Sequence, residues 1–426
     1  MTVRLIRGDV RERLAELPDQ SVQCVVTSPP YYGLRDYGTA QWDGGDPGCD
    51  HRKPSSAEGS TLQGGKKTTG HQQEGYGREC RKCGAVRVDR QIGLEPTLAA
   101  YVETMVQVFR EVRRVLRNDG TLWLNVGDSY NAQPGQRKAT DAAGPKQLTN
   151  NGAVGIGSRS DEGLKPKDLM MVPARVALAL QDDGWWLRSD IIWHKPNPMP
   201  ESVTDRPTSA HEHIFLLTKS ARYYYDADAI REPLAPESAA RYAYGFGGAK
   251  NVRLKATDKP TAVVGDRVAT DGANARNVWT IATAPYKDAH FATFPPELPR
   301  RCIKAGTSEK GCCAACGAPW VRDVGHGDAI GRRDSGTGDR FVDLGMSSGR
   351  AGERHRTTTG WSASCTCDAP VVPCVVLDPF AGAGTTLLVA DQLGRDAIGI
   401  ELNPTYADLA KNRVVNDAPL FAEVRG

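Results

Sequence analysis

The segment from Cys374 to Glu401, CVVLDPFAGAGTTLLVADQLGRDAIGIE, decides the fold class. Its apolar start predicts a strand over 374–377, and the glycine-rich run after it predicts a tight turn that opens a helix. A second apolar run predicts a strand over 396–400, so the segment has the β-loop-α-β rhythm of an open α/β sheet. Glu401 ends the second strand about 20 residues after the turn, where an acidic side chain can accept both ribose hydroxyls of a nucleotide-type cofactor.

The turn itself, Asp378-Pro-Phe-Ala-Gly-Ala-Gly-Thr-Thr386, lacks the lysine of a phosphate-binding loop. Without that lysine, ATP or a dinucleotide loses its electrostatic partner. S-adenosylmethionine fits the turn better, because it is a nucleoside with a sulfonium group and no phosphate. We therefore expect S-adenosylmethionine as the cofactor.

A second motif, Thr27-Ser28-Pro29-Pro30-Tyr31-Tyr32, follows a strand predicted over 24–27. Methyl transfer to the amino group of a base needs hydrogen-bond acceptors that draw the N–H groups out of conjugation with the ring. Ser28 Oγ and the Pro29 carbonyl can accept those bonds. A base within a duplex cannot reach such a loop, so it must be flipped out, and Tyr31 offers a flat face on which it can stack.

Both motifs resemble those of a known family. Asp-Pro-Phe-x-Gly-x-Gly-Thr-Thr is similar to the cofactor motif of amino-group DNA methyltransferases, and Gly399-Ile-Glu-Leu-Asn-Pro404 is similar to its partner strand end. Ser-Pro-Pro-Tyr resembles the catalytic motif of the cytosine-N4 and adenine-N6 members. The resemblance implies catalytic roles for Ser28, Pro29, Pro30 and Tyr31. It implies cofactor contacts for Asp9, Asp378, Phe380, Gly382, Gly384, Thr385, Thr386 and Glu401.

The catalytic motif precedes the cofactor motif, which resembles the circularly permuted β-type arrangement of this bacterial and phage family. The resemblance implies an α/β, Rossmann-like methyltransferase fold in which Asp9 faces the cofactor adenine. It also covers 119–125, 206–213 and 294–298, where Phe294-Pro-Pro-Glu-Leu298 would help to enclose the methionine end of the cofactor.

The target base follows from the first position of the catalytic motif, where members of the family carry Asp, Asn or Ser. Ser28 favours cytosine N4. Adenine N6 stays the alternative, because the same acceptors serve either amino group. Two further possibilities remain open: a relative that acts on RNA or on a protein glutamine, and a DNA-binding protein that has kept the fold without turnover.

Composition adds bounds on location and partners. The 426 residues hold 39% hydrophobic and 25% charged residues, and a net charge of +3 is too small to identify a partner. There is no run of about 18 apolar residues and no apolar stretch typical of a signal peptide. We therefore expect a cytoplasmic protein, in a bacterial cell or a phage-infected host, with duplex DNA as partner. Monomer and homodimer both stay open.

Eleven cysteines in a chain of this kind favour metal binding over disulfides, because cytosolic thiols are kept reduced. Their pairs and a histidine have spacings typical of tetrahedral zinc. The predicted ligands are Cys49, His51, Cys80 and Cys83 in a first set, and Cys313, Cys316, Cys365 and Cys367 in a second. Both sites would be structural, since methyl transfer needs no activated water. Unmetallated cysteines are the alternative.

The organisation of the chain follows from these motifs and from stretches without hydrophobic periodicity. The expected parts are a catalytic part of the core (1–38), a Cys/His insertion (39–93), further core with a mobile loop at 131–167 (94–225), a target-recognition region (226–289), a core helix (290–310), a Cys-rich insertion (311–370) and the cofactor part of the core (371–426).

DNA contacts are expected in the target-recognition region. Arg241, Lys250, Arg253 and Lys255 are interleaved there with aromatic residues, a pattern that can clamp phosphates and stack on bases. A solvated surface loop is the alternative. The recognised base sequence does not follow from the pattern.

Overall fold

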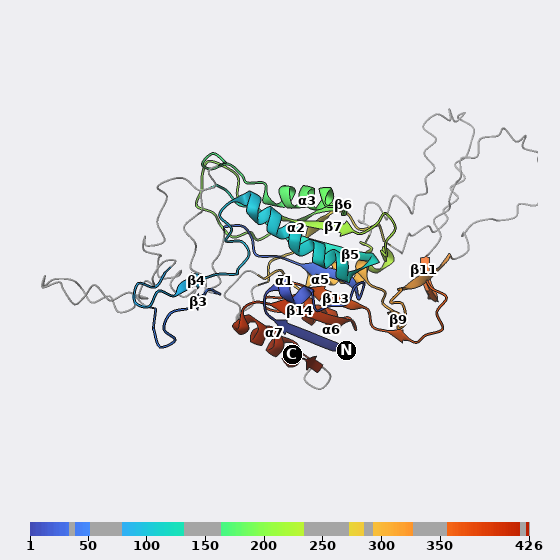
Figure 1. Ribbon diagram of the computed structural model, residues 1–426. Helices are drawn as coiled ribbons and strands as arrows, with labels where there is room; N and C mark the ends of the chain where they lie inside the picture. Colours follow the sequence, from blue (N-terminus) through green and yellow to red (C-terminus); the bar gives the residue numbers. More distant parts are fainter. Residues whose placement is uncertain are drawn as a thin grey trace, which may run out of the picture.

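The computed structural model describes residues 1–33, 39–51, 79–131, 163–233, 272–284, 293–326, 356–417 and 423–425. Nine strands of this part form one sheet (Figure 1). In spatial order they are β15 (Glu423–Arg425), β1 (Thr2–Arg7), β14 (Asp396–Glu401), β13 (Val375–Asp378), β2 (Val22–Thr27), β5 (Leu116–Val126), β7 (His211–Thr218), β6 (Trp186–His194) and β8 (Val278–Thr280).

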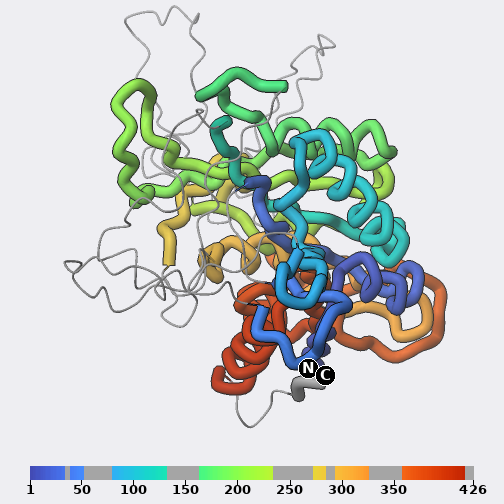
Figure 2. Tube along the Cα trace, turned by 60° about the vertical axis from the view of Figure 1, so that its left-hand side comes forward, coloured from blue at the N-terminus to red at the C-terminus, as the bar shows by residue number. Residues whose placement is uncertain are grey.

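The strands from β15 to β5 are parallel to one another, and β7 is antiparallel to both β5 and β6. The carboxyl ends of β1, β14, β13 and β2 therefore lie along one edge of the sheet, which is where open α/β sheets bind ligands. The first and last strands lie side by side, as the two chain ends do in Figure 2. Strand β2 precedes β13 in the chain yet pairs with it, which confirms the permuted order.

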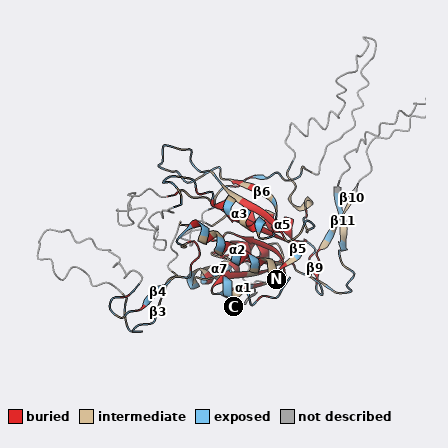
Figure 3. Cartoon of the chain, turned by 45° about the horizontal axis from the view of Figure 1, so that its top comes forward, coloured by how far each residue is buried: buried red, intermediate tan, exposed pale blue. Residues whose placement is uncertain are grey.

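Helices cover both faces of the sheet, and the residues coloured as buried in Figure 3 lie mostly in the sheet and in the helices packed on it. The buried hydrophobic side chains form two clusters, one on each face of the sheet. On one face lie α1 (Val10–Leu14), α2 (Leu98–Val115) and α3 (Val172–Asp182). On the other lie α5 (Glu297–Gly306), α6 (Thr385–Gln392) and α7 (Pro404–Asp417). Adjacent residues of β2 alternate between the two cores, as Cys24 and Val25 do, because side chains along a strand alternate between faces.

Three element boundaries differ from what hydrophobic periodicity predicts, which is a helix of about ten residues ending near Leu17, a turn at Asn118-Asp-Gly120 and a helix over about 169–180. Helix α3 begins at Val172 rather than near Leu169, because Met171 takes a left-handed conformation and the Val172 N–H donates to Asp128 Oδ1. Helix α1 spans only Val10–Leu14 instead of about ten residues. Strand β5 begins at Leu116, directly after α2, and continues through Gly120, which the sequence suggested as a turn.

Small strands build the two insertions. In the first, β3 (Gln41–Asp43) pairs with β4 (Val86–Val88). In the second, β9 (Cys312–Cys313) pairs with β12 (Val371–Val372), and β10 (Trp320–His326) pairs with β11 (Arg356–Ala363). Figures 1 and 3 place the two insertions on opposite sides of the core. No helix in the described ranges is long and apolar enough to cross a membrane.

Candidate active site

The glycine-rich turn joins β13 to α6 and is organised by Asp378. This carboxyl group is 1% exposed, and its Oδ1 accepts hydrogen bonds from Thr27 Oγ1 (2.6 Å) and from the Phe380 N–H (3.1 Å). Burial raises the pKa of Asp378 to about 6. Because Thr27 directly precedes Ser28, this one carboxyl group fixes the start of both predicted motifs.

Two positions in the turn require glycine for steric reasons. Gly382 and Gly384 both have positive φ, and a Cβ on Gly384 would lie 2.8 Å from the Ala410 Cβ of α7. The backbone can therefore pass close to α7 and to a ligand only where no side chain is present. This cradle fits a nucleoside such as S-adenosylmethionine.

Glu401 closes the same turn from the end of β14. Its Oε2 accepts from the Gly382 N–H (2.8 Å), and its Oε1 accepts from the Asn403 N–H (2.8 Å). Burial raises the pKa of Glu401 to about 7, although both N–H groups act in the opposite direction. The half-buried carboxylate has lone pairs left for two hydroxyl donors.

Asp9 follows β1 and lies next to the end of β14, since the Gly8 N–H donates to the Glu401 carbonyl. Its carboxylate caps α1 through the Arg11 N–H (3.0 Å) and also pairs with the Arg11 guanidinium. Burial alone would raise the pKa of Asp9, but the Arg11 bonds and the charges of Arg11 and Arg90 outweigh it and hold the pKa below its ordinary value. Asp9 is thus ionised and 6% exposed.

The remaining predicted cofactor residues are partly or fully enclosed. Thr385 and Thr386 are buried, with the Thr386 hydroxyl bonded to the Val26 carbonyl and the Thr385 hydroxyl accepting from Arg413. Phe380 packs against the core on the α2 face. The two threonines therefore hold α6 against its neighbours.

The predicted catalytic loop, Ser28–Tyr31, leaves β2 with Ser28 half-buried and Pro29 buried. The Tyr101 hydroxyl on α2 donates to the Pro30 carbonyl (2.9 Å). The Tyr31 hydroxyl lies 3.2 Å from Ser28 Oγ, which donates to it, and a Cβ on Gly127 would lie 2.6 Å from the Tyr31 ring. The tyrosine ring therefore packs directly on the backbone after β5.

A polar network behind Tyr31 was not predicted from the sequence. The Tyr31 hydroxyl donates to Glu212 Oε2 (2.7 Å), which also accepts from Asn125 Nδ2 (3.0 Å), and Glu212 Oε1 forms an ion pair with Lys195. Burial raises the pKa of Tyr31 well above its ordinary value, and the charge of Glu212 adds to the effect. In the sequence, Glu212 was marked only by its place in the segment 206–213, which the family resemblance covers without assigning it a role.

The predicted metal ligands come together in two sets. The ligand atoms of Cys49, His51, Cys80 and Cys83 all lie within 4.8 Å of one another, and the same holds for Cys313, Cys316, Cys365 and Cys367. The predicted DNA-binding residues Arg241, Lys250, Arg253 and Lys255 lie outside the described residues, as does 132–162 of the predicted mobile loop.

The sheet and the loops at its carboxyl edge define the class of the protein, an S-adenosylmethionine-dependent methyltransferase with permuted motifs. The DNA methylase family model matches residues 22–314 and 374–412, which is more than half of the chain. The chain therefore belongs to the amino-group (N6/N4) DNA methylase family.

Individual relatives agree with this assignment. The chain is 34% identical to Type II methyltransferase M.Cfr9I of Citrobacter freundii over 96% of this chain and 87% of the relative. It is 35% identical to Type II methyltransferase M.SmaI of Serratia marcescens over 97% and 90%. A solved putative DNA modification methylase of Thermus thermophilus, complexed with S-adenosyl-L-methionine, covers 100% of both chains with 21% identity and a TM-score of 0.45. Family membership depends on the sequence matches alone.

Proposed function

We propose that this enzyme methylates N4 of a cytosine that is flipped out of duplex DNA at a specific site. The observation that carries the proposal is the bond between Thr27 and Asp378, which holds the Ser28–Tyr31 loop beside the glycine-rich turn. An amino group held by one loop and a methyl donor held by the other would then meet at the edge of the sheet. Serine in the first motif position favours cytosine over adenine.

The chain's own residues supply binding and orientation. Glu401 would accept the two ribose hydroxyls, Asp9 would use its remaining lone pair for the adenine amino group, and Gly382 and Gly384 would let the backbone approach. Asp378 acts as a positioning residue, because it is buried and bonds to both loops. Bound S-adenosylmethionine would supply an electrophilic methyl group on a positively charged sulfur.

The transfer step is a direct in-line displacement. Ser28 Oγ and the Pro29 carbonyl accept the amino N–H bonds and so turn the nitrogen lone pair toward the methyl carbon. With the cofactor bound, the N–C bond would form as the C–S bond breaks, S-adenosylhomocysteine would be the leaving group, and the nitrogen would lose one proton to solvent. Tyr31 stacks on the flipped base, with its ring held by the backbone at Gly127 and its hydroxyl by Glu212.

The cofactor affinity should depend on the protonation of Glu401. The ribose hydroxyls donate to the ionised carboxylate, whose pKa burial raises to about 7 in the free enzyme. We expect affinity for S-adenosylmethionine to rise between about pH 6 and 8, by up to about tenfold per unit below the pKa. Titration of cofactor binding across this range tests the prediction, and Glu401→Gln should weaken binding and flatten the profile. An unchanged slope in that variant would remove Glu401 from the proposal.

The same shift has a consequence for the free enzyme's stability. Between the ordinary carboxyl pKa of 4.5 and about 7, the folded state holds the Glu401 proton more tightly than the unfolded chain does. The contribution of this group to the free energy of unfolding therefore falls as the pH rises through that window.

Glu212 should act on transfer through Tyr31. In Glu212→Ala the Tyr31 hydroxyl and Asn125 lose a shared acceptor and Lys195 loses its partner. We expect kcat to fall about tenfold, equivalent to about 1.4 kcal/mol, with little change in cofactor affinity. Steady-state kinetics beside cofactor titration separates the two. A normal kcat would show that the network does not position the ring.

The biological role and the DNA-recognition region are also proposed. The relatives are named Type II methyltransferases, so we infer that this enzyme modifies DNA within a restriction–modification pair in the cytoplasm. We propose residues 226–289 as the target-recognition region, with its Arg and Lys residues on the phosphates. The other parts of the chain are proposed with the bounds that the sequence predicts. Monomer and homodimer are both compatible with this function.

The class of substrate is tested by label transfer. Purified enzyme with methyl-tritiated S-adenosylmethionine is offered unmethylated duplex DNA of high sequence complexity, RNA and protein extract in parallel. We expect label in the duplex DNA, and about tenfold less or lower still with Ser28→Ala, which lacks one amino acceptor. Label confined to RNA or protein would contradict the proposal.

A further inference from the structure

We propose that the chain binds two zinc ions with different tasks: the ion at Cys49, His51, Cys80 and Cys83 positions the Ser28–Tyr31 loop, and the ion at Cys313, Cys316, Cys365 and Cys367 fastens the second insertion to the opposite edge of the sheet. The number of ions is independent of the proposed function, whereas the positioning of the loop rests on it.

The geometry of the first set matches a tetrahedral ion. Zinc–sulfur bonds of about 2.3 Å and a zinc–nitrogen bond of about 2.05 Å at tetrahedral angles require ligand separations of about 3.8 Å between sulfurs and about 3.5 Å between sulfur and nitrogen. Cys49 Sγ and Cys80 Sγ are 3.8 Å apart, and Cys83 Sγ and His51 Nδ1 are 3.5 Å apart. The sulfur–sulfur separation is far longer than the bond of about 2.05 Å in a disulfide. The ligand atoms of all four residues lie within 4.8 Å of one another.

The same backbone turn presents a cysteine pair at each site. The Gly84 N–H donates to the Cys80 carbonyl (2.7 Å), and the Gly317 N–H donates to the Cys313 carbonyl (2.7 Å). Both glycines have positive φ, so the chain reverses directly after each Cys-x-x-Cys pair. The two insertions thus present a cysteine pair with the same backbone turn.

Among the residues that the structure describes, the first insertion has only a small hydrophobic core of its own. Its hydrophobic cluster contains only Cys80 and Ala85 as buried members among the described residues, with Trp42 and two further ligand cysteines packed around them. Trp42 also stacks on the His51 ring, 4.7 Å between centroids. A module with so small a core needs a metal or disulfides for stability, and every cysteine here is free.

The first insertion contacts the Ser28–Tyr31 loop and the neighbouring Arg11 directly. It leaves the core directly after the Ser28–Tyr31 loop and returns at Gly93, whose carbonyl accepts from the Gly33 N–H (2.9 Å). A Cβ on Gly93 would lie 2.9 Å from the Tyr31 carbonyl. The Arg90 carbonyl accepts from Arg11, the partner of Asp9. An ion that fixes this insertion therefore fixes the exit of the catalytic loop.

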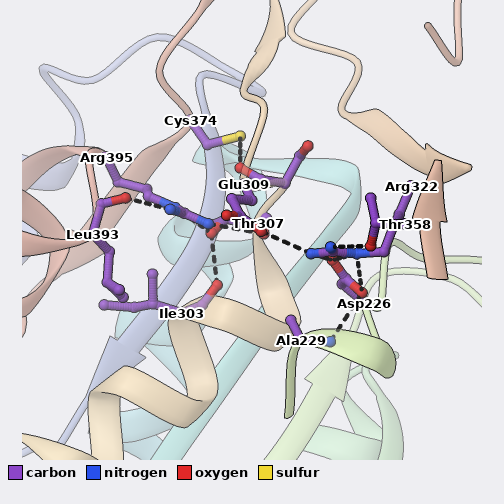
Figure 4. Close-up of polar contacts among 11 residues, drawn as sticks. Asp226, Ala229, Ile303, Thr307, Glu309, Arg322, Thr358, Cys374, Leu393 and Arg395 are labelled. Carbon is purple, nitrogen blue, oxygen red and sulfur yellow. Dashed lines mark hydrogen bonds and ion pairs between the residues drawn. The ribbon is translucent and has the colours of Figure 1, made fainter. Parts of the chain in front are cut away.

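The second insertion docks at the amino ends of the strands, away from Ser28. Gln23, at the start of β2, bonds to the Gly317 carbonyl (3.4 Å) and to the Val375 N–H (2.6 Å), and Arg117 donates to the Cys316 carbonyl. Figure 4 shows Arg322 of β10 bonded to Asp226, Glu309 and Thr358. The bonds to Gln23, Arg117, Asp226 and Glu309 tie the insertion to the core without touching the Ser28–Tyr31 loop. The bond to Thr358 joins β10 to β11 within the insertion.

Thiolate-rich tetrahedral sets favour zinc over the hard cations, which prefer oxygen. Metal analysis of the purified enzyme is expected to find two zinc ions per chain. Cys83→Ser and Cys316→Ser should each retain one. Lys82→Ala, which changes an exposed side chain between Cys80 and Cys83, should retain two zinc ions. Fewer than two zinc ions per wild-type chain, or iron in their place, would overturn the assignment.

The division of tasks is tested on the same proteins. Cys83→Ser should lower kcat at least tenfold more than Cys316→Ser, whereas Cys83→His, which keeps a zinc ligand at the same position, should retain most of the activity that the serine variant loses. Equal losses in the two serine variants would overturn the positioning role.

Hydrogen–deuterium exchange over residues 28–33 makes the same comparison without any methyl transfer. Exchange there should be faster in Cys83→Ser than in Cys316→Ser. Equal exchange would again refute the positioning role. If the wild-type enzyme transfers no methyl group, the proposed function fails while the zinc count and the exchange comparison still stand. Should a serine variant not fold, the exchange of the wild-type enzyme is measured with and without a chelator, and unchanged exchange over residues 28–33 after loss of zinc would refute the positioning role.

Discussion

Tyr31→Ala is expected to lower kcat/KM for DNA by about 10- to 100-fold, because stacking of a base on an aromatic ring contributes about 1–3 kcal/mol. The cofactor should bind the variant almost as well as the wild type, since Tyr31 lies on the catalytic loop and its hydroxyl bonds to Ser28 and Glu212. Steady-state kinetics and equilibrium titration of S-adenosylmethionine measure the two quantities separately.

Tyr31→Phe is the matched control for that experiment. It keeps the ring and loses only the hydroxyl bonds, so it should resemble Glu212→Ala and not Tyr31→Ala. Equal losses of transfer and cofactor affinity in Tyr31→Ala would mean that the ring supports the cofactor turn, and the stacking role would then be wrong.

The Asp378→Ala variant should lose cofactor affinity and transfer together. Its carboxyl group is buried and accepts bonds from Thr27 and from the Phe380 N–H, and a hydrogen bond to a charged group contributes about 1.5–3 kcal/mol. We expect the cofactor dissociation constant to rise by about 10- to 100-fold, with a lower melting temperature. Titration and thermal unfolding check both.

Asp378→Asn separates charge from geometry. Both bonds go to Oδ1, and an amide oxygen in that position can still accept both without the charge, so its defect should be smaller than that of Asp378→Ala. Normal cofactor affinity in the alanine variant would contradict the role of Asp378 in joining the two loops.

The two motifs and their permuted order could be predicted because they are local features of the sequence. The apolar run before each motif predicts a strand, and the permuted order follows from which motif comes first. The grouping of the cysteines could be predicted for the same reason, since each pair lies within a single turn. The structure brings both sets together.

Long-range contacts could not be predicted. The bond from Thr27 to Asp378 joins residues 351 positions apart, and nothing in either motif reveals that Asp378 points into the core. Glu212 bonds to Tyr31 across 181 positions, through antiparallel pairing of β7 with β5 that the sequence does not specify. The start of α3 was misplaced because its capping carboxylate, Asp128, lies 44 residues earlier.

Methylation of an amino nitrogen of cytosine in DNA can be observed in the product itself. Purified enzyme and S-adenosylmethionine are incubated with unmethylated duplex DNA of varied sequence, the DNA is digested to nucleosides, and the products are identified by mass spectrometry. We predict N4-methylcytosine. N6-methyladenine would contradict the choice of base while leaving the amino-group mechanism, and DNA without either product would contradict the proposed function as a whole.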